Sequence, residues 1–152
     1  MRFTLPRLGR LVAALWLACA ASGAVLAQDP RVSAVQVAAR EWLVWVDRGD
    51  TQTSWGAAGK KFQAVISPTV WADALKKEQE RMGTVTRRTV GPTRFQTTLP
   101  GSPDGEYAQI LFSTAFANNA NGRETLTMER EADGKWRVIG YLPLDPRQVP
   151  RP

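Results

Sequence analysis

Carboxylates and tyrosines would suffice for acid–base chemistry in this chain, which has no histidine and whose single cysteine is Cys19. An enzyme built from such groups would use a carboxylate as the base and a tyrosine or protonated acid as the proton donor. The candidate bases are Asp47, Glu106 and Glu124, and the candidate donors are Tyr107 and Tyr141. No spacing fixes two of them together, so the sequence assigns no catalytic residue and disfavours an enzyme. A buried carboxylate–tyrosine pair is the observation that would favour one.

Metal and cofactor sites are disfavoured for the same reason. Zinc sites and thiol or imidazole catalysis need cysteine or histidine, and the mature chain would have neither. Residues 99–106 (LPGSPDGE) contain carboxylates but lack the alternating acidic ligands of a calcium loop, so we interpret them as a surface turn. We expect no metal and no cofactor.

The N-terminus predicts export. Arg2, Arg7 and Arg10 precede an apolar run at 11–20, and Val25-Leu26-Ala27 ends the segment with small or slim residues. This is typical of a secretory signal peptide at 1–27, too short to be a permanent membrane span. Cys19 lies where a lipid could be attached, but Trp16-Leu17-Ala18 lacks the small residue that lipoprotein sites have two positions upstream. The interpretation favoured is therefore a periplasmic or secreted protein without a lipid anchor.

The remaining chain has the length of one domain. We expect a single domain at 28–144 and a disordered, proline-rich tail at 145–152 (DPRQVPRP). Removing the signal peptide lowers the formal charge from +6 to +3, since 17 basic residues remain against 14 acidic ones. The basic residues are scattered in pairs without a stripe, so nucleic acid is not an expected partner.

Hydrophobic periodicity predicts helices first and strands afterwards. Apolar residues recur at helical spacing over 31–48 and 55–65, and a third helix begins at Ser67-Pro68 and ends at Gly83. From Thr84 the period becomes two, with strands at 84–97, 106–117, 123–132 and 135–142, and with turns at Asn121-Gly122 and Asp133-Gly134. The predicted class is α+β, with three N-terminal helices packed on a curved four-stranded antiparallel meander sheet.

The tripeptide Arg48-Gly49-Asp50 matches an adhesion signal, but it also has a structural interpretation. Gly49 follows the first helical stripe, where a left-handed residue is wanted, and Asp50 or Thr51 can cap the next helix. We therefore interpret the tripeptide as the joint between two helices.

A pocket between helices and sheet is the expected binding site. Its apolar wall would come from aromatic residues on both layers, namely Trp42, Trp71, Phe112 and Tyr141. If Asp133-Gly134 is a two-residue turn, Met128 pairs with Ile139 and Leu126 with Tyr141, while Arg130 stands unfavourably opposite Arg137. The other sheet face would then carry Trp136, Val138 and Leu142, a surface that could join two copies in a homodimer.

The order of motifs resembles a known family. The stretches EWLVWVDRGD, TSWGAAGKKF, VWADALKKEQERMG, LPGSPDGEY and GKWRVIGY, spread over about residues 34–142, are similar to small exported bacterial proteins catalogued as domain of unknown function 4019. Nothing catalytic is assigned to that family, so the resemblance implies an architecture and a compartment but no reaction. The element order is also similar to the nuclear transport factor 2-like, or cystatin-like, roll, whose helices and curved sheet enclose a cone-shaped cavity.

Three functions stay open at this point. The favoured one is a non-enzymatic accessory or binding module, which takes a small apolar ligand in its pocket or an envelope protein on its sheet face. The alternatives are a small roll-type isomerase or dehydratase using carboxylate and tyrosine chemistry, and a structural envelope component. Fold resemblance cannot choose among them.

Overall fold

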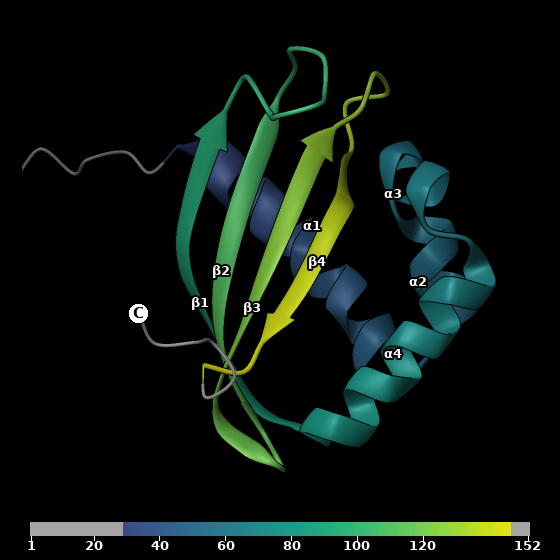
Figure 1. The fold of residues 1–152 in the computed structure, drawn as a ribbon. Coiled ribbons are helices and arrows are strands. Elements are labelled where there is room, and N and C mark those ends of the chain that lie inside the picture. Colours follow the sequence, from purple (N-terminus) through teal and green to yellow (C-terminus); the bar gives the residue numbers. More distant parts are fainter. Residues whose placement is uncertain (1–28, 147–152) are drawn as a thin grey trace, which may run out of the picture.

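The computed structural model describes residues 29–146, and it confirms the predicted α+β class. Four helices precede four strands in the chain, and α1 lies across one face of the sheet while the other helices lie beside β4 (Figure 1). The predicted signal peptide and most of the predicted tail lie outside the described residues. Within residues 29–146, no helix combines the length and the apolar character needed to cross a membrane.

The helices begin and end where their capping residues stand. They are α1 (Pro30–Asp47), α2 (Thr51–Ala57), α3 (Lys60–Val65) and α4 (Pro68–Met82). Asp50 accepts a hydrogen bond from the Thr53 amide at the start of α2, and Ser67 does the same for Val70 at the start of α4. Gly49 has a φ of +68° in the joint between α1 and α2, which confirms the structural interpretation of that glycine. The second predicted helix is divided into α2 and α3.

The strands form a simple meander. They are β1 (Val85–Gln96), β2 (Tyr107–Phe116), β3 (Asn119–Arg130) and β4 (Trp136–Leu144), and all neighbours are antiparallel in the order β1-β2-β3-β4. The β1–β2 register shifts between Val90 and Thr93, around the Gly91-Pro92 dipeptide. At the other edge, the Gly59 amide donates a hydrogen bond of 2.8 Å to the Val138 carbonyl, which docks the start of α3 on β4.

The predicted turn at Asn121-Gly122 is wrong. Gly122 lies inside β3 and pairs with Thr114, and the chain reverses earlier, between Phe116 and Asn119. The glycine is needed for close packing, because a Cβ atom at position 122 would lie 2.7 Å from the Phe116 ring. The glycine of this dipeptide therefore serves close packing inside a strand and does not form a turn.

The predicted register of β4 is correct in one half only. Leu126 pairs with Tyr141, but Met128 pairs with Val138 rather than with Ile139, because a bulge shifts the register between Thr127 and Met128. The loop at Asp133-Gly134 is longer than a two-residue turn, since β3 ends at Arg130 and β4 begins at Trp136.

The bulge removes the clash of like charges that the simple register implied. Arg137 pairs with Glu129 and not with Arg130. It also forms ion pairs with Glu131 and Asp133, at 2.8 and 2.7 Å. A cross-strand arginine pair is thus replaced by contacts between opposite charges.

The same shift corrects the expected outer surface. Val138 is 1% exposed and belongs to the core, and Trp136 is partly buried against that core, so neither lies on the outer sheet face. Leu142 alone of the three is widely exposed, at 55%. A homodimer through this surface stays a prediction, without Val138 as a contact.

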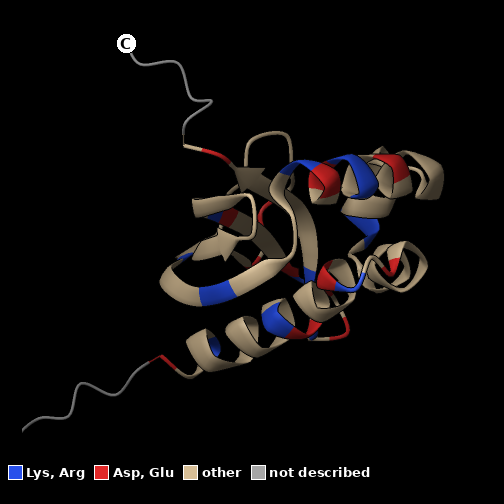
Figure 2. Ribbon diagram, turned by 90° about the horizontal axis from the view of Figure 1, so that it is seen from below, with Lys and Arg blue, Asp and Glu red and all other residues tan. Residues whose placement is uncertain are grey.

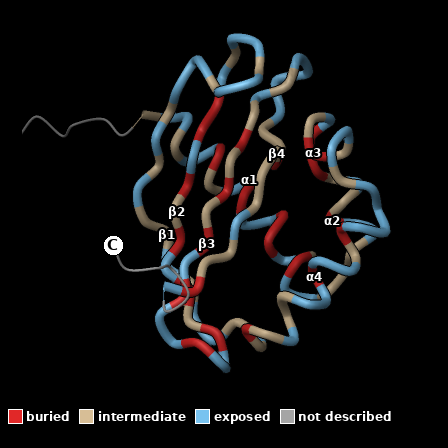
Figure 3. Tube along the Cα trace, in the orientation of Figure 1, coloured by how far each residue is buried: buried red, intermediate tan, exposed pale blue. Residues whose placement is uncertain are grey.

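One core joins the helices to the inner sheet face (Figure 3). It contains residues from α1, α3, α4 and the three strands β2 to β4, and the alternating burial of β2 and β3 shows the expected period of two. Acidic and basic segments lie close to one another along the helices (Figure 2), as in the pair between Arg81 and Glu78 on α4. Asp145, assigned above to the tail, is buried and lies 3.7 Å from Arg81, so ordered structure continues past position 144.

Candidate functional site

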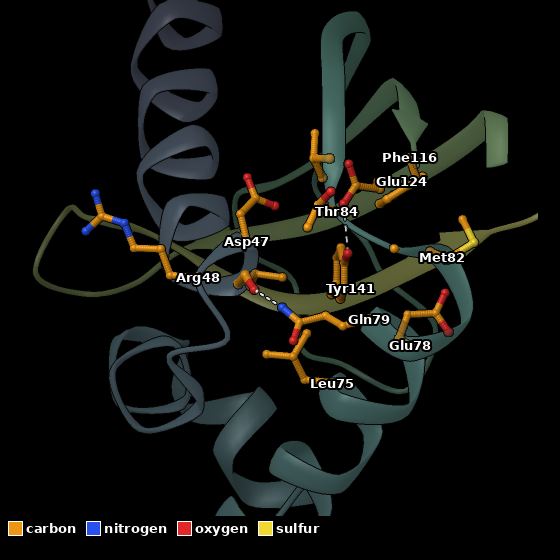
Figure 4. A pocket seen from close by; sticks show the side chains of 13 residues that line it. Asp47, Arg48, Leu75, Glu78, Gln79, Met82, Thr84, Phe116, Glu124 and Tyr141 are labelled. Atoms are coloured by element: carbon orange, nitrogen blue, oxygen red, sulfur yellow. Dashed lines mark hydrogen bonds between the residues drawn. The ribbon is translucent and has the colours of Figure 1, made fainter. Parts of the chain in front are cut away.

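A pocket of about 240 Å³ lies between α4, the C-terminal end of α1 and the sheet (Figure 4). Its apolar walls come from Val46, Leu75, Met82, Val85 and Phe116, and its polar side chains from Asp47, Arg48, Glu78, Gln79, Thr84, Glu124 and Tyr141. We call this space the Glu124 pocket.

Glu124 is the buried ionisable group of this pocket, with no exposed surface. It reaches the interior because it shares the inward face of β3 with Leu126 and Met128, two positions apart each time. A carboxylate in such a place needs donors for its oxygens. Glu124 has four, namely Arg88 Nε at 2.6 Å, Arg88 Nη2 at 3.0 Å, the Thr114 hydroxyl, and the Tyr141 hydroxyl at 2.7 Å.

Arg88 links this buried carboxylate to the surface. Its guanidinium also donates two hydrogen bonds to Asp47, of 2.7 and 2.8 Å, so one arginine joins the end of α1 to β3. Burial by itself would lower the pKa of Arg88, but the hydrogen bonds to Asp47 and Glu124 outweigh it and raise the pKa further above its usual value. The guanidinium therefore stays charged, and it forms a bidentate ion pair with each of the two carboxylates, Glu124 and Asp47.

Tyr141 stands between the polar network and the aromatic core. Its ring centroid lies 5.4 Å from that of Trp42 and 6.1 Å from that of Trp71, while its hydroxyl points to Glu124 (Figure 4). Burial, followed by the negative charge of Glu124, raises the pKa of the Tyr141 hydroxyl well above its usual value. The hydroxyl is thus held protonated as a donor.

Of the four aromatic residues predicted to form the pocket wall, the structure brings three together. Trp42, Trp71 and Tyr141 are in mutual ring contact. Phe112 is buried in the same core and pairs across the sheet with Glu124. Among the described residues, Tyr141 is the one member of this set that lines the Glu124 pocket, so the others stay a prediction as ligand contacts.

The rim of the pocket carries oxygen acceptors. Asp47 and Glu78 line it, each paired with an arginine, Arg88 and Arg81 respectively. The Gln79 side-chain amide donates to the Val46 carbonyl, which leaves its own oxygen as an acceptor. Arg48 also lines the pocket, but its side chain extends away from the other labelled residues in Figure 4.

The other candidate residues lie apart from this pocket. Tyr107 accepts a hydrogen bond from Lys61 and donates one to the Pro103 carbonyl, and Glu106 pairs with Arg130 on the surface. Neither lines the Glu124 pocket. In the part of the chain that the structure describes, no three aspartate, glutamate, histidine or cysteine residues gather in a way that could hold a metal ion.

Sequence reasoning missed Arg88 and Thr114, which complete the network. Arg88 lies on β1 opposite Thr114 on β2, and β2 in turn pairs with β3, so both residues are distant from Glu124 in the sequence. One sequence signal could have pointed to them. Glu124 alternates with Leu126 and Met128 on one strand face, so its carboxylate is expected to point inward and to need hydrogen-bond donors.

Comparison with known proteins places the chain in a family without giving it a reaction. No curated protein matches it. A solved structure, described as a 2.5 Å structure from Catenulispora acidiphila, is similar with a TM-score of 0.45 and 13% identity, over 75% of this chain and 90% of that one. The family described as Protein of unknown function (DUF4019) matches residues 38–141. This chain therefore belongs to the DUF4019 family of proteins of unknown function.

Proposed function

We propose that this protein is an exported, non-enzymatic binding module that takes a small, mainly apolar molecule in the Glu124 pocket. The observation that carries the proposal is a pocket with apolar walls whose one fully buried carboxylate, Glu124, is already occupied by four donors. Such walls provide affinity through burial, and the few polar groups fix orientation.

The size of the pocket sets the size of the ligand. An apolar cavity of roughly 150 Å³ is large enough for benzene. The volume of about 240 Å³ therefore fits one or two fused rings with a small substituent. The polar rim offers acceptors from Asp47, Glu78 and Gln79, so the substituent that suits it is a hydrogen-bond donor.

The bonding of Glu124 supports binding over catalysis. A general base must offer a lone pair to the proton it removes. Each Glu124 oxygen already accepts two hydrogen bonds, one from Arg88 and one from a hydroxyl. A carboxylate has about four lone-pair sites, so the set is full.

A second candidate function is a roll-type isomerase or dehydratase. The observation that favours it is the buried Tyr141–Glu124 pair, with 2.7 Å between the phenol and carboxylate oxygens. For catalysis, Arg88 would have to release Glu124 when the substrate binds. The similarity to a nuclear transport factor 2-like roll belongs to this candidate and stays a proposal.

Native mass spectrometry on the protein purified gently from its own host tests the main proposal. We expect a discrete extra mass that is lost on denaturation. Titration with indole and benzofuran then tests the pocket, because the two rings have the same size and differ by one N–H donor. Indole should bind more tightly.

Two matched variants locate the binding. Thr84→Trp fills the Glu124 pocket from an exposed position and should abolish binding of indole. Thr89→Trp adds the same ring to an exposed position on β1 that does not line the pocket, and should leave binding unchanged. Equal binding by both variants, or a clean apo mass with no binding of either ring, would refute the proposal.

The catalytic candidate has a separate readout. An enzyme that removes a proton from carbon will place deuterium in the released ligand during incubation in D₂O, and Glu124→Gln will stop this exchange. A ligand that returns without deuterium excludes the Glu124 base. Fractionation of the native host tests export, with the protein expected in the periplasmic or extracellular fraction.

A further inference from the structure

Among the five tryptophans that the structure describes, two differ from the other three in the bonding of their indole nitrogens. Trp42 donates to the Ser54 carbonyl at 2.8 Å, Trp55 to the Ile66 carbonyl at 2.7 Å, and Trp71 to the Ser54 hydroxyl at 2.9 Å. Within the described residues, the indole N–H groups of Trp45 and Trp136 have no hydrogen-bond partner, and no buried polar side-chain atom is left unsatisfied there. Both N–H groups are therefore open to solvent or to a ligand.

These two tryptophans line the same hollow. It has a volume of about 390 Å³ and lies between α1, α2 and the start of β4. Small residues leave it open, and a Cβ atom added at Gly56 on its wall would meet nothing within 4 Å. Trp136 is supported on another side by Phe95, with 5.9 Å between the ring centroids. We call this space the tryptophan hollow.

The charged groups of the tryptophan hollow are opposite in sign. Glu41 and Lys135 line it, and neither side chain forms an ion pair within residues 29–146. Arg137, which also lines it, is bound to Glu131 and Asp133. The hollow is thus lined by two tryptophans with unpaired indole N–H groups, one lysine and one glutamate, which together can donate and accept hydrogen bonds beside aromatic surface.

We infer that the tryptophan hollow binds a sugar ring of a neutral di- or oligosaccharide. A sugar has apolar C–H faces that pack on aromatic rings, and its hydroxyls both donate and accept hydrogen bonds. An anionic ligand would meet the Glu41 carboxylate, a cationic ligand would meet Lys135, and a purely apolar one would bury both charges without partners. A neutral, hydroxyl-rich ring satisfies all of these groups.

The tryptophan hollow is separate from the Glu124 pocket. No residue lines both spaces. The inference therefore does not depend on the proposed function, and variants of one space test it without changing the walls of the other.

The test is a titration of the full protein with N,N′-diacetylchitobiose and with cellobiose, to about 10 mM, since weak complexes have dissociation constants near 1 mM. The indole N–H resonances in two-dimensional NMR are the readout. We expect at least one disaccharide to shift those of Trp45 and Trp136. The resonance of Trp71, which donates to the Ser54 hydroxyl and does not line the hollow, should stay in place.

Variants separate stacking from hydrogen bonding. Trp45→Leu removes both and should weaken binding about tenfold, whereas Trp45→Phe keeps an aromatic face and should weaken it less. Val44→Leu changes an exposed neighbour on α1 outside the hollow and should change nothing. Because Trp45 is partly exposed, the phenylalanine variant is expected to fold, and its NMR spectrum checks this.

Several results would overturn the inference. One is the absence of any shift of the Trp45 and Trp136 resonances with either disaccharide. Another is a shift that Trp45→Leu leaves unchanged. A third is binding of benzoate or benzylamine without either disaccharide, which would assign the hollow to a charged aromatic ligand instead.

Discussion

Replacing Glu124 by glutamine is the sharpest test of the network around it. Each Glu124 oxygen accepts one hydrogen bond from Arg88, Oε2 from Nε and Oε1 from Nη2. Whichever way a glutamine amide turns, its NH₂ group therefore faces an N–H of Arg88, and neither can accept. The Thr114 and Tyr141 hydroxyls can rotate to adapt, but the guanidinium cannot.

The expected loss follows from this geometry. Removing one partner of a buried ion pair destabilises a protein by about 3–5 kcal/mol. Arg88 keeps both bonds to Asp47 and its side chain is 14% exposed, which places Glu124→Gln at the low end, about 3 kcal/mol. For a domain of this size that loss lowers the melting temperature by roughly 12 °C.

Urea denaturation followed by tryptophan fluorescence measures the free energy of unfolding, and an unchanged m-value shows that the folded state keeps its compactness. Glu129→Gln is the matched control, because Glu129 pairs with Lys61 at 2.7 Å in a more exposed setting and should lose less than about 1 kcal/mol. Equal losses for the two variants would refute the reasoning. A gain in stability for Glu124→Gln would do so more strongly, since it would show a strained carboxylate held ready for catalysis.

Three further predictions concern other parts of the fold. Because the pKa of Tyr141 is raised in the folded protein, its protonated hydroxyl contributes fully to stability below the usual tyrosine pKa of about 10. This contribution is lost as the pH rises through the pKa that Tyr141 has in the folded protein. Tyr141→Phe should therefore lose less stability above about pH 10 in alkaline denaturation curves than the wild type. Gly49→Ala, at a φ of +68°, should lower the free energy of unfolding by about 1 kcal/mol in urea titration, as a joint between helices requires. Deleting residues 145–152 should lower thermal stability more than deleting 147–152, because Asp145 is buried beside an arginine.

Each of these has a contrary result. A wild-type alkaline curve for Tyr141→Phe would mean that the hydroxyl is solvated in the folded protein. No change for Gly49→Ala would remove the structural explanation of that glycine. Equal stability of the two truncated chains would show that Asp145 does not contribute to the stability of the folded domain.

The local features of this fold could be predicted from the sequence, and the long-range ones could not. The start of α4 at Ser67-Pro68 and the alternation of β2 depend on neighbouring residues, so periodicity and capping reveal them. The bulge in β4 is visible only in its pairing with β3, and the need for glycine at position 122 only in the contact with the Phe116 ring. Neither feature can be inferred from the turn dipeptides Asp133-Gly134 and Asn121-Gly122 alone.

The candidate site shows the same division. Glu124 and Tyr141 could be named from the sequence as chemical groups, but their contact requires the pairing of three strands. Arg88 comes from β1 and reaches Glu124 on β3 across the intervening β2. Without the strand pairing, the sequence does not show which of the 17 basic residues after position 27 is the partner of Glu124.

The two outer strands have a consequence for self-association. An open sheet edge is a template to which another chain can add a strand, the first step towards fibrils. Here β1 carries Pro92, which has no N–H to donate, within a shifted register, and β4 bonds through Val138 to Gly59 at the start of α3. Both edges are thus blunted against strand addition, so any pairing of two copies would have to use side chains such as Leu142 rather than extension of the sheet.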